Sequence, residues 1–253
     1  PNITNNFYTQ LAEVIEEKLG EKGYNTYLCN TRRKIEKESR YVDSLIARRV
    51  DGVIFSPTRV KPEDNDINKR NIEELQKNGI AVVAFGSHFK DVSQLYINTY
   101  NGALEAVRYL ISLGHKRIGF IDGLTAGTRQ SRRRGYLKGL KEAGLPMEPH
   151  LITSGNLELD GGYDCAKKLL SDKDPPTAII AVNNLMAIGT LKAAEDMGIK
   201  VPDDLSVIGF DDSLMSEAVK PSLTVVKQPL KDIGNEAARL LIDQLDGEGE
   251  IQT

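Results

Sequence analysis

The stretch 176-PTAIIAVNNLMAIG-189 decides the fold of this chain. Its apolar run, residues 178–182, is typical of a strand that helices cover on both faces. The asparagine pair that follows can cap the start of a helix. The same order returns at 205-LSVIGFDD-212, where an apolar strand again ends in a polar pair. Strand–helix–strand units of this kind form parallel sheets through right-handed crossovers, so the sequence predicts a doubly wound α/β fold.

Strands and helices alternate along the whole chain. Helices are expected near 7–19, 35–48, 67–77, 102–113, 132–143, 162–170, 185–197 and 230–245. Strands are expected near 24–29, 52–55, 80–85, 94–97, 117–121, 151–153, 178–182, 206–210 and 222–227. Because the alternation restarts after Gly123, we expect two Rossmann-like lobes joined by a hinge, one of residues 1–122 plus 229–253 and the other of residues 123–228. Ligands of open parallel sheets bind beyond the carboxyl ends of the strands, so two facing lobes would enclose a binding cleft.

Composition excludes several classes of protein. The 253 residues carry 33 Lys and Arg against 36 Asp and Glu, a net charge of −3, which argues against an electrostatic nucleic-acid surface on these residues. No apolar run approaches the roughly 18 residues that a membrane helix needs. The cysteines, Cys29 and Cys165, indicate reduced thiols rather than a disulfide framework. With no secretory signal, we expect a cytoplasmic protein without a membrane partner.

Motifs for catalysis and for metal or cofactor binding are absent from the sequence. His88, His115 and His150 have no metal-ligand spacing, and no cysteine lies near them. The chain has no Gly-x-Gly-x-x-Gly turn, no Gly-x-Ser-x-Gly elbow, and no lysine in the glycine-containing stretch 123–128 where a phosphate loop would need one. We therefore expect no catalytic residue, no metal and no cofactor, and predict that the protein is not an enzyme.

Polar and aromatic side chains gather where predicted strands end and helices begin, at 5–8, 130–136, 156–157, 183–184, 211–212 and 228. Each has a structural explanation as well: Asn and Asp can cap helices, the arginines can form a solvated face, and Phe7 or Tyr8 can belong to the core. Taken together, their amide, carboxylate, guanidinium and aromatic groups suit a small polyhydroxylated ligand such as a sugar. They suit a phosphate less well, because no glycine-rich helix start presents bare N–H groups.

Six stretches in order, 48–54, 113–121, 134–140, 176–189, 201–212 and 223–229, resemble the effector-binding region of the lactose-repressor (LacI/GalR) family of bacterial transcription regulators. That region is similar in fold to periplasmic sugar-binding proteins. The resemblance places a DNA-binding helix-turn-helix head and the first strand of the sheet before residue 1, and further strands after residue 253. It implies a homodimeric regulator, expected to be a repressor, that contacts operator DNA through the head.

The resemblance also implies the residues that bind the effector. Asn5, Phe7 and Tyr8 would line the cleft from the first lobe, and Arg132, Leu157, Asn183, Asp211 and Gln228 would line it from the second. Ser87 joins the first group, at a place where the family often has an aspartate, and Leu157 stands where a ring is often found. The expected effector is a sugar or related polyol, in preference to a nucleobase. Its binding would close the lobes and reposition the DNA-binding heads.

Two other functions share part of this pattern. A periplasmic sugar-binding protein of a transporter would have the same lobes and cleft, but the stretches 201–212 and 223–229 favour a regulator. A hydrolase or kinase of α/β fold would need a nucleophile or a phosphate loop, and neither was found in the sequence.

Overall fold

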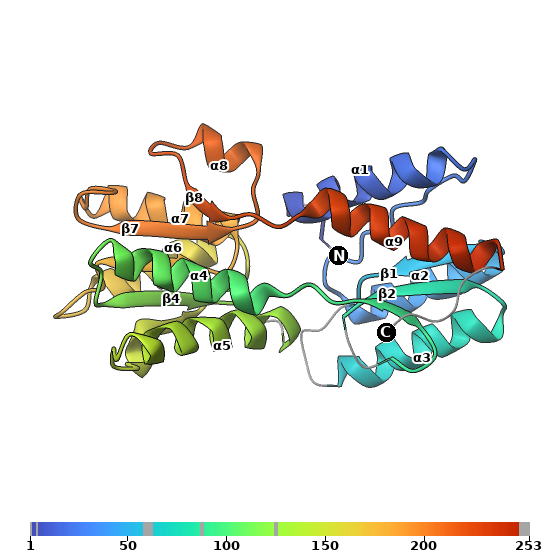
Figure 1. Cartoon of the computed structure of the whole chain (residues 1–253), viewed down its shortest axis with the longest axis horizontal. Coiled ribbons are helices and arrows are strands. Elements are labelled where there is room, and N and C mark those ends of the chain that lie inside the picture. The colour runs from blue at the N-terminus through green and yellow to red at the C-terminus, as the bar shows by residue number, and fades with distance from the viewer. Residues whose placement is uncertain (1, 4, 58–62, 87–88, 124–125, 248–253) are drawn as a thin grey trace. The chain divides into compact units, whose positions relative to one another are not determined.

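The structure is a computed structural model that describes residues 2–3, 5–57, 63–86, 89–123 and 126–247. The chain forms two compact units: unit 1 comprises Pro1–Ile97 and Pro229–Thr253, and unit 2 comprises Asn98–Gln228. Each unit is an α/β layer structure with a parallel sheet, which confirms the predicted fold class (Figure 1). Within the described ranges, no helix combines the length and the apolarity needed to cross a bilayer.

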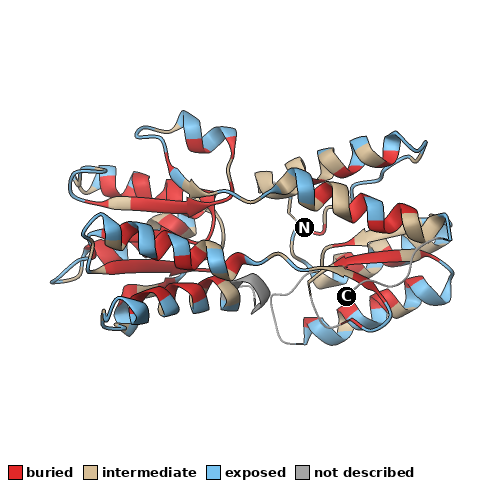
Figure 2. Ribbon diagram, viewed as in Figure 1, coloured by how far each residue is buried: buried red, intermediate tan, exposed pale blue. Residues whose placement is uncertain are grey.

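Unit 2 is built around a five-stranded parallel sheet. Its strands, in spatial order, are β5 (Ile152–Ser154), β4 (Ile118–Asp122), β6 (Ala178–Ala181), β7 (Ser206–Phe210) and β8 (Thr224–Val226). The register aligns Phe120 with Ile180, and Ile180 with Ile208. One face carries α4 (Thr99–Ser112) and α5 (Ala126–Glu142), and the other carries α6 (Leu159–Leu170) and α7 (Asn184–Asp196) (Figure 1). Of the three central strands, β4 and β6 are buried along their length, and β7 is buried from Val207 onward (Figure 2).

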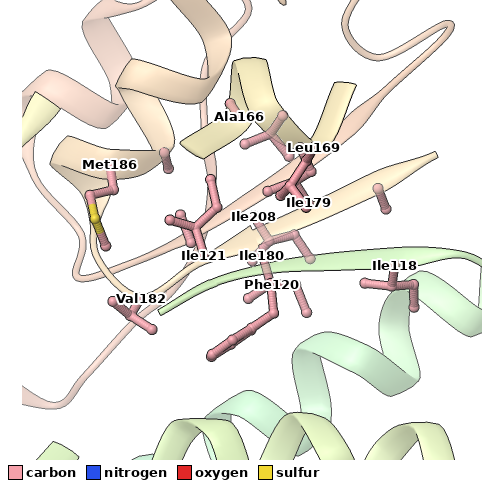
Figure 3. Close-up of a cluster of buried hydrophobic side chains, with 14 of the residues drawn as sticks. Ile118, Phe120, Ile121, Ala166, Leu169, Ile179, Ile180, Val182, Met186 and Ile208 are labelled. Carbon is pink, nitrogen blue, oxygen red and sulfur yellow. The ribbon is translucent and has the colours of Figure 1, made fainter. Parts of the chain in front are cut away.

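The core of unit 2 lies on both faces of this sheet. Side chains alternate along β4, so that Phe120 points toward α4 and α5 while Ile121 points to the opposite face (Figure 3). The Phe120 ring stacks on Tyr136 of α5, with 4.7 Å between the ring centroids, and the Tyr136 hydroxyl donates to the Ile118 carbonyl at 2.8 Å. Burial of apolar side chains therefore holds the helices on the sheet, and the hydrogen bond of Tyr136 further fixes the position of α5.

Glycines allow the helices of each pair to approach closely. On α5, a Cβ at Gly135 would collide with the Tyr100 carbonyl of α4. Between α6 and α7 the approach is equally close, because a Cβ at Gly189 would collide with the Leu159 carbonyl and lie 2.7 Å from the Tyr163 nitrogen. These contacts bring the start of α7, and the strand ends beside it, into a fixed position.

Unit 1 contains three described strands in the order β1 (Gly52–Phe55), β2 (Ala81–Phe85) and β3 (Ser93–Leu95), all parallel. Its helices are α1 (Asn6–Gly20), α2 (Ile35–Ala47), α3 (Asp64–Lys77) and α9 (Leu230–Leu245). Two buried clusters hold them: Leu11, Ile15 and Leu19 of α1 pack with α9, while Val42 of α2 packs with Ile72 and Leu75 of α3. Since α9 follows unit 2 in the sequence, the last helix of unit 1 is synthesised only after all of unit 2.

Three features differ from the sequence-based expectation. The predicted strand 24–29 has no ladder partner among the described residues, and Tyr27 and Leu28 are 68% and 53% exposed. A 3₁₀ turn at Pro149–Leu151 and a short helix α8 (Leu214–Ala218) were not anticipated. The first unit ends at Ile97 rather than at 122, because α4 packs on α5 and because β4 pairs with β5 and β6, which come later in the chain.

We predict that Gly189→Ala destabilises unit 2 by about 1–3 kcal/mol, because the added methyl group has no space between α6 and α7. Gly20→Ala is the matched control: a Cβ at Gly20, also helical, meets nothing within 4 Å, so that change should be neutral or stabilise by up to about 1 kcal/mol. Urea unfolding followed by circular dichroism measures both. Equal free energies of unfolding for the two variants would contradict the close packing of α6 and α7.

Candidate functional site

The candidate site lies at the carboxyl edge of the unit 2 sheet. Because β4, β6 and β7 are parallel neighbours, their carboxyl ends meet at one edge. Asp122 is the last residue of β4, Asn183 caps the helix that follows β6, and Asp211 directly follows β7. The polar side chains that follow these apolar strands therefore lie together at the carboxyl edge of the sheet, as the sequence predicts for Asn183 and Asp211.

Arg132 of α5 brings a positive charge to this edge. The residue is 8% exposed, and its guanidinium lies over the Phe210 ring, 4.3 Å from the ring centroid. Nη1 donates to the Val182 carbonyl, and Nη2 lies 3.7 Å from Asp211 Oδ1. A buried guanidinium needs such partners, because burying an unpaired charge is strongly unfavourable.

Asp211 is the anionic partner of Arg132. It is 5% exposed, has φ of 71°, and donates its backbone N–H to the Val226 carbonyl at 3.1 Å. Gln228 Nε2 donates to Asp211 Oδ1, so this carboxylate joins the end of β7 to the residue that follows β8. Burial raises the pKa of Asp211, against the smaller opposing effects of Arg132 and Gln228.

Asn183 and Leu157 form the other side of the same edge. Asn183, 3% exposed, accepts the Met186 N–H at Oδ1 (2.8 Å) and so caps α7. Its Nδ2 donates to the Leu157 carbonyl at 2.9 Å. Five residues are connected in this way. Asp211 contacts Arg132 and Gln228, Asn183 contacts Leu157, and the two groups meet at the neighbouring residues Val182 and Asn183. We call Arg132, Leu157, Asn183, Asp211 and Gln228 the strand-end cluster.

Two further polar groups lie at the same edge: Asp122, which the sequence analysis did not identify, and Asn184, which it placed among the polar strand-end residues but not among the effector-binding residues. Asp122 is fully buried, accepts the Gly123 N–H at 2.9 Å, and has Oδ2 3.8 Å from Arg133 Nη1. The available signal was a carboxylate at the carboxyl end of a buried strand, as at Asp211, which directly follows β7. Asn184 is buried as well, and its Nδ2 donates to Ser213 Oγ at 2.7 Å, which ties the start of α7 to the start of α8.

The other predicted residues belong to unit 1. Asn5 caps α1 by accepting the Phe7 N–H at 2.9 Å, and the Phe7 and Tyr8 rings meet edge to face with centroids 5.1 Å apart. Phe7 also packs on the core between α1 and α9, so the core explanation holds for part of its surface. Ser87 lies outside the described residues.

The strand-end cluster suits an uncharged ligand. Arg132 and Asp211 balance each other's charge, and the cluster also supplies amide groups and an aliphatic side chain. Gln228 Oε1 is buried without a hydrogen-bond partner in the part of the chain that the structure describes, which leaves an acceptor that a hydroxyl donor would satisfy. The same part of the chain contains no group of His, Cys, Asp and Glu that could hold a metal ion.

We predict that Asp211→Asn alters the pH dependence of stability. Because burial raises the pKa of Asp211, the folded chain holds this proton more tightly than the unfolded chain. Wild type should therefore lose stability relative to the variant as the pH rises from the ordinary aspartate pKa of about 3.9 through the raised value. Urea unfolding between about pH 4 and pH 7 measures this difference. If wild type instead gains stability relative to the variant as the pH rises, the pKa of Asp211 is lowered by Arg132 and the prediction is wrong.

Comparisons with known proteins agree with this architecture. Residues 107–253 match the periplasmic binding protein-like domain family. The HTH-type transcriptional regulator DegA of Bacillus subtilis is 38% identical over 243 residues, which cover 94% of this chain and 70% of DegA. The HTH-type transcriptional repressor PurR of Pasteurella multocida is 32% identical over 245 residues, which cover 96% of this chain and 72% of PurR.

Among solved structures, a LacI family transcriptional regulator from Enterococcus faecium with bound ribose matches with a TM-score of 0.85 and 28% identity. The match covers 100% of this chain and 91% of that one. The similar proteins named here are transcriptional regulators, which favours a regulator over a transporter component and over an enzyme. On the strength of the identity and coverage shared with these relatives, the chain belongs to the LacI family of transcriptional regulators.

Proposed function

We propose that this chain senses a sugar or related polyol, and that the strand-end cluster of unit 2 binds it. The observation that carries this proposal is the buried, charge-balanced Arg132–Asp211 pair with Gln228 beside it. A carboxylate accepts hydrogen bonds from hydroxyl groups, a guanidinium donates them to hydroxyl oxygens, and an amide does both, which is the recognition that a polyol needs. The cluster offers no excess positive charge for a phosphate or a carboxylate ligand.

Two further observations support a neutral, hydroxyl-rich effector. The Enterococcus faecium regulator, 28% identical, has ribose bound. Leu157 also supplies an aliphatic contact beside the polar groups, which suits the apolar face of a sugar ring. Asn5, Phe7, Tyr8 and Ser87 of unit 1 stay predicted contacts of the same effector.

The regulatory role extends the same proposal. The chain would act in the cytoplasm as part of a homodimeric repressor, and effector binding would control operator binding by a DNA-binding head outside this sequence. The similarity to the repressor PurR supports repression rather than activation of transcription. An effector can act only through different affinities for two conformations, and couplings of about 1–3 kcal/mol are typical of such regulators.

We predict that D-ribose or another pentose or hexose raises the melting temperature of the chain, and that Asp211→Asn removes most of this rise. The affinity should fall by about tenfold to a hundredfold, because a hydrogen bond to a charged group contributes about 1.5–3 kcal/mol. A thermal-shift screen of sugars, sugar phosphates and nucleobases, followed by calorimetry, measures both effects.

Asp212→Asn is the matched control for this experiment. Asp212 is the neighbouring carboxylate, but it pairs with Lys227 at 2.9 Å rather than with Arg132. Its substitution should leave sugar binding within about twofold of wild type. Stabilisation by nucleobases or sugar phosphates alone, or equal effects of the two substitutions, would contradict the proposed site.

We predict that the chain sediments as a dimer, at about twice its mass of 27.9 kDa, in analytical ultracentrifugation at micromolar concentration. A monomer at all concentrations tested would contradict the homodimer and would remove the symmetry that the reading of a palindromic operator requires.

A further inference from the structure

A cavity lies at the amino edge of the unit 2 sheet, at the opposite end of β7 from the strand-end cluster. Its volume is about 220 Å³, and it is lined by α4, α7 and the residues around the starts of β7 and β8. The space arises because β8, an edge strand of this sheet, is shorter than β7 (Figure 1). The register pairs β8 with Ile208–Phe210, so within the described chain Ser206 and Val207 have no strand neighbour on that side. The Leu223 N–H, one residue before β8, donates to the Ser216 carbonyl at 2.8 Å and does not extend the ladder.

The walls of this cavity are apolar and uncharged. Tyr109 and Leu110 of α4, Leu113 directly after that helix, and Leu191 of α7 contribute to them. None of the residues that line the cavity in the described part of the chain carries a charge. A cavity of about 150 Å³ with aliphatic walls binds benzene, so the larger volume here suits a single ring with one small substituent. The walls favour a neutral molecule, because nothing in them would compensate an ion for its lost hydration.

Ser206 supplies a polar group to the cavity, and a chain of hydrogen bonds sets the direction of that group. Ser206 Oγ lies 2.9 Å from His115 Nε2, and His115 Nδ1 lies 2.9 Å from Thr177 Oγ1. Thr177 Oγ1 donates its one proton to the Arg117 carbonyl at 3.4 Å, so it accepts from His115 Nδ1. These contacts assign the proton of a neutral imidazole to Nδ1.

The Ser206 hydroxyl therefore offers an acceptor to the cavity. Burial lowers the pKa of His115, which keeps the ring neutral at pH 7. A neutral ring with its proton on Nδ1 accepts at Nε2, so the Ser206 O–H donates to it. The lone pairs of Ser206 Oγ then face a requirement of their own, which a hydrogen-bond donor on a molecule in the cavity would meet.

We infer that this cavity is a second small-molecule site, and that it binds a neutral, monocyclic aromatic molecule whose hydroxyl group donates to Ser206 Oγ, as phenol can. The ring would lie against Leu110, Leu113 and Leu191. The inference goes beyond the proposed function, because it uses no residue of the strand-end cluster and holds whether or not a sugar binds there.

Phenol and toluene test the hydrogen bond, since they are similar in shape but only phenol donates. Both affinities can be measured by NMR titration of the whole chain. Ser206→Ala should lower the affinity for phenol about threefold to tenfold and leave that for toluene within about twofold. Retained toluene binding also shows that the variant is folded. Failure of phenol to bind wild type, or equal changes for the two molecules, would overturn the inference.

Ser206→Thr is the conservative variant, because threonine keeps the hydroxyl group at a position where a strand begins. It should restore the ratio of phenol to toluene affinity to within about twofold of wild type. A ratio as low as that of Ser206→Ala would mean that the hydroxyl group is not what phenol recognises, and the assigned contact would be wrong.

Leu113→Ala tests the wall. It should weaken phenol and toluene alike, by about twofold to tenfold, because it removes apolar surface and leaves the acceptor in place. Met147→Ala is the matched control: Leu113 and Met147 are 57% and 60% exposed, but Met147 does not line the cavity. It should leave both affinities within about twofold of wild type.

Nuclear Overhauser effects locate the bound ring. In wild type they should connect the phenol protons with the methyl groups of Leu110 and Leu191, at the amino edge of the sheet. Contacts with the Leu157 methyl groups instead would place phenol at the strand-end cluster, and equal effects of Leu113→Ala and Met147→Ala would mean that the cavity is not the site. Either result contradicts the inference.

Discussion

A buried guanidinium is the constraint on which the rest of unit 2 depends. Arg132 places a full positive charge between α5 and the sheet, where leaving it unpaired would cost about 3–5 kcal/mol, a large part of the net stability of a domain. Its partners come from the ends of two neighbouring strands: the Val182 carbonyl after β6, and the carboxylate and ring of Asp211 and Phe210 at β7. Satisfying one charge therefore fixes the relative positions of α5, β6 and β7.

The fold of unit 2 can hold this buried ion pair because its apolar core and its polar strand ends occupy different parts of the sheet. Apolar strands and closely packed helix pairs hold the middle of the sheet, where the Tyr136 hydroxyl is bonded to the Ile118 carbonyl. Within the described part of unit 2, the non-glycine residues with positive φ are Leu157 and Asp211, and both lie at the carboxyl edge of the sheet. Unfavourable backbone conformations gathered at one edge of a well-packed unit are typical of binding sites, where precise side-chain positions matter more than stability.

Most of the fold could be predicted from the sequence, because continuous apolar runs and capping residues are local signals. The strand 24–29 could not, since a strand also requires a neighbouring strand, and the local sequence says nothing about whether one is present. The boundary at Ile97 was missed for a similar reason: the strands that pair with β4 come from later in the chain. At the site, residue types and strand ends identified Arg132 and Asp211, but only the geometry shows that the Asn183 amide bonds to the Leu157 carbonyl and the Met186 N–H.

The central claim is that the Arg132–Asp211 edge binds a neutral, hydroxyl-rich molecule. A crystal structure of this chain grown with the sugar that stabilises it most tests the claim directly. The account predicts density for the sugar at this edge, with one hydroxyl donating to the Asp211 carboxylate and another accepting from Arg132. Sugar density at any other place, with the Arg132–Asp211 pair in contact only with protein atoms, would contradict it.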